Sequence, residues 1–322
     1  MRLRLVPEQT SYDFFRYRRI TSAISVVAVV LSLVAWMVMG LNFGIDFSGG
    51  TSIRTESPNA VDVGAYRAAL DPLALGDLRI TEVFDPSFGE SRNVAMIRLA
   101  AQEGQESVTG DTIAAVEAAL QGLDPQVVLA SVESVGPKVS GELVRTAFIA
   151  VAVAMALIMV YIWLRFEWQF AVGAVAALFH DVILAIGIFS VLQIRFDLAT
   201  IAALLTIIGY SINDTVVIFD RLRENLRKFK TMPLVDVMNL SVNETLSRTL
   251  MTSGTTLLAL IALLALGGDV IRGFVFAITW GIVVGTYSSL YVAKNIVLQL
   301  GVKRDWSKTG GEPGTQFGDD PA

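Results

Sequence analysis

The chain has 322 residues and a formal net charge of −5, and 53% of its residues are hydrophobic. Its mean hydropathy of +0.59 is far above that of a soluble domain, which excludes a soluble enzyme. There is no cysteine, so disulfides and thiol chemistry are excluded, and a single histidine offers no cluster with metal-ligand spacing. The composition therefore indicates a membrane protein without a metal or a cofactor.

Six apolar segments are long enough, at about 18 residues or more, to be transmembrane helices. The first could instead be a secretory signal, but its apolar run is too long and no clear small-residue cleavage site follows it. We expect a polytopic helical protein with its first helix at 20–41 and five more within 141–298. In chain order the apolar runs are Ile20–Met39, Leu143–Leu164, Phe170–Leu192, Leu198–Phe219, Thr249–Leu266 and Phe274–Leu298.

Lysine and arginine gather in three segments, which are 1–19, 220–247 and 299–322. The positive-inside rule predicts that these are the cytoplasmic N-terminus, a cytoplasmic helical hairpin and the cytoplasmic C-terminus. The C-terminal tail is rich in Gly, Pro and Asp, which predicts disorder. Residues 42–140 then lie outside, and their fourteen acidic against six basic side chains fit a translocated domain.

This outside segment has the pattern βαββαβ, which is typical of a ferredoxin-like α+β domain. It contains no nucleophile–base pair, no phosphate loop and no basic stripe for nucleic acid. We interpret it as a binding or mechanical module, because this fold alone names no function. The predicted elements are the strand Thr51–Glu56, the helix Ala60–Leu70, a hairpin of Leu78–Phe84 and Asn93–Leu99, the helix Gly110–Leu120 and the strand Gln126–Val135.

Two ionisable residues stand out in the fourth and fifth spans, Asp214 and Arg248. A charge in hydrocarbon costs about 2.5–3.5 kcal/mol on the insertion scale, so such residues usually mark ion or proton pathways. Each is seventeen residues from Thr231, so an antiparallel hairpin would place them at the same depth. Helical spacing puts further polar residues on the same faces: Thr206, Tyr210 and Asn213 with Asp214, and Glu244, Thr252 and Thr255 with Arg248.

The functional hypothesis is that Asp214 binds a proton when Arg248 moves away and releases it when Arg248 returns, because burial favours the neutral carboxyl and a nearby arginine the charged one. Two structural alternatives stay open. The two residues could form a fixed ion pair that joins the helices, or Arg248 could pair with Glu244 along its own helix.

Other polar and small residues within the spans are weaker candidates. His180 and Asp181, in the third span, could be a proton relay or could bond a neighbouring helix. Gly281–Gly285 and Gly173–Ala177 have small residues four apart, which predicts close contacts between helices.

Four motifs identify a family. Gly44–Thr51, with Gly44, Asp46, Gly49 and Gly50, follows the first span, and Ser134–Leu143, with Gly136 and Pro137, precedes the second. Ile208–Asn225 covers the end of the fourth span, and Glu244–Thr256 opens the fifth. Together, from about residue 12 to 302, they resemble the bacterial SecF proteins, which are protein-export membrane proteins of the SecD/SecF family in the resistance-nodulation-division superfamily.

The resemblance implies a role in protein export. SecF proteins pair with SecD beside the SecYEG channel and the ATPase SecA, and use the proton gradient to draw preproteins across the inner membrane late in translocation. It also implies that Asp214 and Arg248 are proton-pathway residues, and that the periplasmic domain contacts the emerging chain.

Two other functions compete with this interpretation. A small-molecule exporter of the same superfamily usually has twelve spans, so a six-span chain would have to pair with itself. An assembly factor that transports nothing would use the polar residues only to join helices, and would be insensitive to protons.

Overall fold

The computed structural model describes residues 10–83, 93–100 and 108–302 of the chain. The predicted turn at 85–90, the last residue of the strand expected to reach Phe84, and the predicted tail beyond residue 302 lie outside the described residues.

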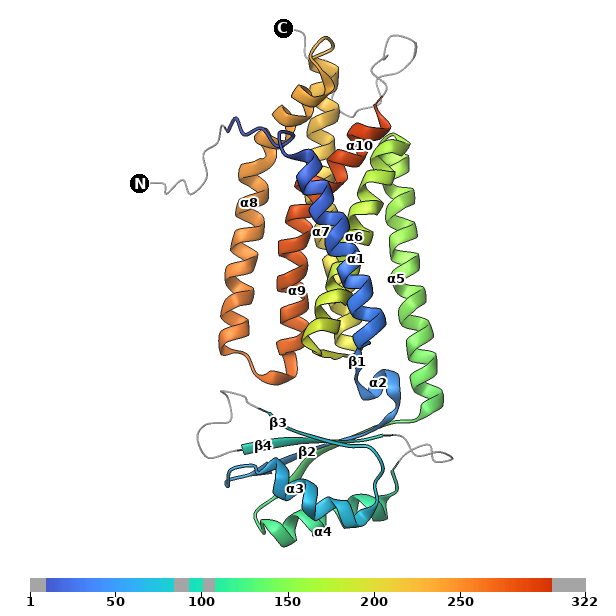
Figure 1. Cartoon of the computed structure of the whole chain (residues 1–322), viewed down its shortest axis with the longest axis vertical. Helices are drawn as coiled ribbons and strands as arrows, with labels where there is room; N and C mark the ends of the chain where they lie inside the picture. Colours follow the sequence, from blue (N-terminus) through green and yellow to red (C-terminus); the bar gives the residue numbers. More distant parts are fainter. Residues whose placement is uncertain (1–9, 84–92, 101–107, 303–322) are drawn as a thin grey trace, which may run out of the picture.

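Within that part of the chain, six helical segments are long and apolar enough to cross a membrane, as the sequence predicts. Figure 1 shows them running side by side, with a small α/β domain at one end of the bundle. They are α1 (Arg18–Met39), α5 (Pro137–Arg165), α6 (Trp168–Leu192), α7 (Leu198–Lys228), α8 (Leu234–Leu266) and a sixth segment made of α9 (Asp269–Ser288), the π-helical turn η3 (Ser289–Ala293) and α10 (Lys294–Leu300).

The hairpin between the fourth and fifth spans is more continuous than the apolar runs suggest. Helix α7 continues nine residues beyond Phe219, and α8 begins directly after Pro233. The second half of the predicted cytoplasmic hairpin, residues 234–247, is therefore the first part of one long helix, because no proline interrupts residues 234–266. Both helices project beyond the apolar length that a bilayer covers.

The outside domain has the predicted ferredoxin-like order. Its four antiparallel strands lie in the order β3-β4-β2-β5, and α3 and α4 cover the face turned away from the bundle (Figure 1). The core between helices and sheet includes Ile53, Ile97 and Leu120, all fully buried. The elements are β2 (Gly50–Ser57), α3 (Val63–Leu70), the 3₁₀ turn η1 (Asp71–Leu73), β3 (Leu78–Val83), β4 (Asn93–Leu99), α4 (Gly110–Leu123) and β5 (Val128–Val135).

Three predicted boundaries in this domain are wrong by two or three residues. Helix α4 ends at Leu123 rather than Leu120, and each of the other two differs because of an aspartate. Helix α3 begins at Val63 rather than Ala60, since the Asp62 side chain caps it by accepting hydrogen bonds from the backbone amides of Gly64 and Ala65. Strand β5 begins at Val128 rather than Gln126, because the Gln126 amide donates to the Asp124 carboxylate in a turn. This bond and one from Ser57 hold the pKa of Asp124 below its usual range.

The glycine-rich motif after α1 joins the domain to the bundle. Strand β1 (Asn42–Phe43) pairs in parallel with β6 (Arg195–Phe196), and the short helix α2 (Ile45–Ser48) follows. A Cβ on Gly44 would lie 3.2 Å from the Cβ of Asp197. Gly49 and Gly50 have φ angles of 71° and 116°, which other residues rarely adopt. The motif is therefore a tight structural joint.

Three further motif residues shape the same junction. The Asp46 carboxylate accepts from the first amide of α7, at 3.1 Å. Gly136 caps the start of α5 and Pro137 is its first residue, where a missing amide hydrogen has no cost.

The predicted glycine contacts between helices are confirmed. A Cβ on Gly281 of α9 would lie 2.3 Å from the Ile207 side chain of α7, and one on Gly173 of α6 would lie 2.8 Å from the Ala293 carbonyl oxygen. Close approach of α9 to α7 thus requires glycine at 281.

We expect Gly281→Ala to destabilise the protein by about 1–3 kcal/mol, the usual effect of overpacking. Gly141→Ala, on the exposed start of α5 where an added Cβ meets nothing, should have no such effect. The midpoint of thermal unfolding in detergent measures both. Equal midpoints for the two variants would show that α7 and α9 can separate freely.

Candidate functional site

Asp214 lies on the buried side of α7, with only 4% of its surface exposed. Arg248 of α8 and the Ser253 hydroxyl are the groups that act on its carboxyl electrostatically. Asp214 and Arg248 nevertheless form no ion pair with each other, although both belong to the described part of the chain. The alternative of a fixed, closed ion pair therefore does not describe this structure, and the facing of the two side chains stays a prediction.

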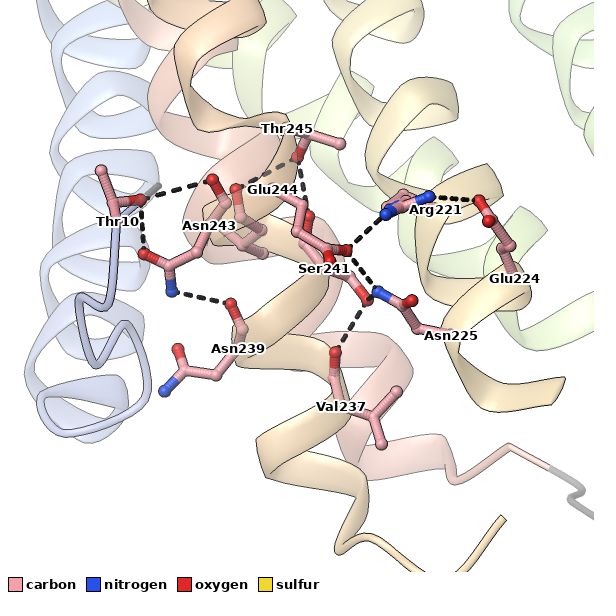
Figure 2. Close-up of polar contacts among 11 residues, drawn as sticks. Thr10, Arg221, Glu224, Asn225, Val237, Asn239, Ser241, Asn243, Glu244 and Thr245 are labelled. Atoms are coloured by element: carbon pink, nitrogen blue, oxygen red, sulfur yellow. Dashed lines mark hydrogen bonds and ion pairs between the residues drawn. The ribbon is translucent and has the colours of Figure 1, made fainter. Parts of the chain in front are cut away.

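Glu244 is bound elsewhere. Its carboxylate accepts from Arg221 at 2.7 Å and from Asn225 at 2.6 Å, both on α7, as Figure 2 shows. Arg221 also pairs with Glu224, at 2.6 Å. The alternative that pairs Arg248 with Glu244 along one helix is therefore wrong. These bonds join α7 to α8 about one helical turn from Arg248.

The predicted polar faces are only partly right. Eight residues advance an α-helix by about 80° beyond two full turns, so Thr206 points away from Asp214 and is exposed. Its hydroxyl donates to its own helix, as does that of Thr252, which is also exposed. Tyr210 alone reaches across, with its hydroxyl 3.4 Å from that of Thr256 on α8. Asn213 is exposed.

Ser253 and Thr256 are the residues that helical spacing from Arg248 did not select. Ser253 is buried and shares a hydrogen bond of 2.8 Å with Thr286 of α9. It therefore links the surroundings of Asp214 to the sixth span. The cluster of small hydroxyl residues at 252–256 indicates a polar surface in this part of α8. Helical spacing from Arg248 selected Thr252 and Thr255 from this cluster, whereas Ser253 and Thr256 make the contacts with other helices.

His180 and Asp181 form a second, separate polar cluster. Asp181 is 1% exposed, and one carboxylate oxygen lies 3.0 Å from Nδ1 of His180. The other oxygen accepts from Ser211 of α7 at 2.6 Å and from Ser288 of α9 at 2.8 Å. The cluster thus ties three helices together. Ser211 lies three residues before Asp214 on α7, so the cluster is about one helical turn from Asp214 on nearly the same face of that helix.

We expect Asp181→Ala to destabilise the bundle by about 3–5 kcal/mol, because it leaves His180, Ser211 and Ser288 buried without their shared acceptor. Asp220→Ala should change little, since Asp220 is exposed and its pair with Arg165 is a surface contact of 3.3 Å. Thermal unfolding in detergent and the amount of folded protein in membranes measure both. An Asp181→Ala protein as stable as the parent would remove the structural role and favour a relay.

The remaining predicted residues lie elsewhere. Gly44, Asp46, Gly49 and Gly50, with Gly136 and Pro137, occupy the junction with the outside domain, far along α7 from Asp214. No group of three histidine, aspartate or glutamate side chains within the described ranges is arranged to hold a metal ion.

These features define a multi-pass membrane protein with an α+β domain outside the bundle and ionisable side chains buried between its helices. Residues 115–303 match the family described as "Protein export membrane protein SecD/SecF, C-terminal", and residues 34–57 match the "SecD/SecF GG Motif". The chain belongs to the SecD/SecF family.

Named relatives and solved structures agree with this family. The chain is 65% identical to protein translocase subunit SecF of Cereibacter sphaeroides, over 98% of both chains. It is 61% identical to that of Rhodobacter capsulatus, over 98% of this chain and 96% of the relative.

Crystal structures of SecDF match 92% of this chain. The Thermus protein, described as translocon-associated, matches with a TM-score of 0.81 at 36% identity. SecDF in a super-membrane-facing form gives 0.67 at 37% identity. In each case the chain spans only 39% of the SecDF chain.

Proposed function

We propose that this chain is the SecF-type subunit of a protein-export machine that uses the proton gradient to promote late translocation of preproteins. The observation that carries the proposal is a buried carboxyl, Asp214, within a membrane helix, on which the positive charge of Arg248 of the next helix acts without an ion pair. In a family named for protein export, that arrangement supplies a group able to take up and release a proton.

The chemistry rests on two opposing effects. Burial disfavours the charged carboxylate, and a cation nearby favours it. A movement of Arg248 toward or away from Asp214 therefore changes which protonation state is favoured. One charge that crosses 100 mV contributes about 2.3 kcal/mol, which shifts a two-state equilibrium by about fiftyfold. Proton entry can thus bias the position of α8, and with it the outside domain that α8 and α9 approach.

A partner follows from the surface of α7 and α8. Thr206, Gly209 and Asn213 of α7 are exposed, and so are Arg248 and Thr252 of α8. Polar groups in a bilayer face protein or water rather than lipid, so another polypeptide should cover this face. We propose that SecD covers it, beside the SecYEG channel and SecA. The basic segments then lie in the cytoplasm, as expected for an inner-membrane subunit with both termini inside.

The test uses inverted membrane vesicles at saturating ATP, with SecD and with or without this chain. Preprotein translocation should rise with a proton gradient only when both subunits are present. Equal translocation with and without the gradient would favour an assembly role. A twelve-span homodimer that uses the proton gradient to export a small molecule, with no effect on preprotein translocation, would favour the exporter.

A further inference from the structure

A basic cavity lies between the first and sixth spans, at the end of the bundle that holds the N-terminal segment. Its volume is about 430 Å³, and it is lined by Arg18, Arg19 and Ser22 of α1 and by Asn295, Leu298 and Gln299 of α10. Figure 1 shows the start of α1 and α10 at this end of the bundle. The cavity is separate from both Asp214 and the Asp181 cluster.

The cavity walls are tied together by hydrogen bonds. The Asn295 amide donates to the Ser22 hydroxyl at 3.3 Å. Deeper along the same pair of segments, the Ser25 and Tyr287 hydroxyls share a bond of 2.9 Å, and Tyr287 also donates to the Thr21 carbonyl. The two walls are therefore held at a fixed separation.

One wall of the cavity carries an amide side chain whose oxygen lacks a hydrogen-bond donor. Asn295 is 6% exposed, and its side-chain oxygen has no partner in the described structure. A buried amide oxygen without a donor is costly, so a ligand that brings a hydroxyl would be stabilised here.

The cavity is also rich in positive charge. Arg18 and Arg19 are exposed, and no acidic side chain in the described ranges forms an ion pair with either. Lys294, the next residue before Asn295, does not line the cavity. Its ammonium is buried against the rings of Phe14 and Phe15, at 4.7 and 4.2 Å from their centroids. The two arginines are thus available to an anion.

A shallow, exposed apolar groove on one face of α1 continues from the cavity. It shares Arg19 with the cavity and then follows Ile20, Ile24, Val27 and Leu31, which recur at helical spacing on one face. The twelve residues from Arg19 to Leu31 rise about 18 Å. This length is close to half of a hydrocarbon core of about 30 Å, which is the depth of one leaflet.

We propose that the cavity and groove form a binding site for an anionic glycerophospholipid. The phosphodiester lies between Arg18 and Arg19, a headgroup hydroxyl donates to the oxygen of Asn295, and one acyl chain lies along α1 down to Leu31. A free phosphate ester shares the headgroup chemistry. The groove, which begins at the same arginine and has the length of a leaflet, favours the lipid.

The test measures lipid binding to the purified, delipidated full chain by native mass spectrometry. The probes are phosphatidylglycerol, phosphatidylcholine and soluble glycerol 3-phosphate. We expect phosphatidylglycerol to bind about tenfold or more tightly than phosphatidylcholine, and Arg18→Gln/Arg19→Gln to abolish this preference. Arg16→Gln is the matched control, because Arg16 is an exposed arginine that lies against Tyr17 and outside the cavity.

A second variant keeps the proposal testable if the double variant does not fold. Asn295→Asp preserves shape but places a negative charge beside the phosphodiester, so it should weaken phosphatidylglycerol binding and leave phosphatidylcholine binding unchanged. Equal binding of the two lipids would overturn the proposal, and so would an equal loss in Arg16→Gln. Tight binding of glycerol 3-phosphate would replace the lipid by a soluble ester.

Discussion

With Asp214→Asn, we expect preprotein translocation to lose the whole part that depends on the proton gradient, while translocation driven by ATP alone continues. Asparagine has the shape of aspartate but cannot exchange a proton at neutral pH. The shift of about fiftyfold that one charge gains from 100 mV would then be absent. Inverted vesicles that carry the variant and SecD, energised or not, measure the difference.

Asp220→Asn is the matched control for this variant. Asp220 lies on the same helix, six residues further along, but is exposed and bound to Arg165 at the surface. It should keep the full enhancement by the gradient. Asp214→Asn protein that assembles with SecD and also keeps the enhancement would make the Asp214 site structural, and the proton path would then be sought first at His180 and Asp181.

Arg248→Leu should have an effect nearly as large, for the opposite reason. Without its cation, Asp214 has no nearby charge that favours release of the proton, so the carboxyl should stay neutral through the cycle. Arg248→Lys should retain a substantial part of the enhancement, because lysine keeps the charge and loses only the planar guanidinium. The same vesicle assay compares the three proteins.

A nearby arginine provides the control here as well. Arg223 lies on α7 at the end of the bundle, and its guanidinium donates to the Arg165 carbonyl oxygen at 3.3 Å. Arg223→Gln should leave the response to the gradient unchanged. If Arg248→Leu retained the full response, Arg248 would not be the group that moves relative to Asp214.

Much of the fold follows from local patterns. Apolar length predicts the six spans, and alternating strands between two helical patterns predict the outside domain. Errors arise where a single side chain sets a boundary, as Asp62 does at the start of α3. The equal spacing of Asp214 and Arg248 from Thr231 predicts one depth for the two residues. The contacts of Tyr210 with Thr256 and of Asn225 with Ser241 instead centre on residue 233, so Arg248 lies about one helical turn nearer the end of the hairpin than Asp214 does.

The partners of polar groups could not be predicted in the same way. Ser211 and Ser288 both donate to Asp181, yet they are far apart in the sequence and meet only because α7 and α9 pack closely at glycine. Glu244 binds Arg221 rather than Arg248, since side chains across the hairpin compete with those along one helix. The exposure of Arg248 depends on a surface that this chain does not itself cover.

The most direct test of the account asks which carboxyl binds the proton. Infrared difference spectra of this chain with SecD in bilayers, recorded as the pH is stepped, report each carboxylic acid by its C=O stretch. We predict a band that disappears in Asp214→Asn and remains in Asp181→Asn. A spectrum in which the band survives in Asp214→Asn and is lost in Asp181→Asn would contradict the account and place the proton at the buried three-helix cluster.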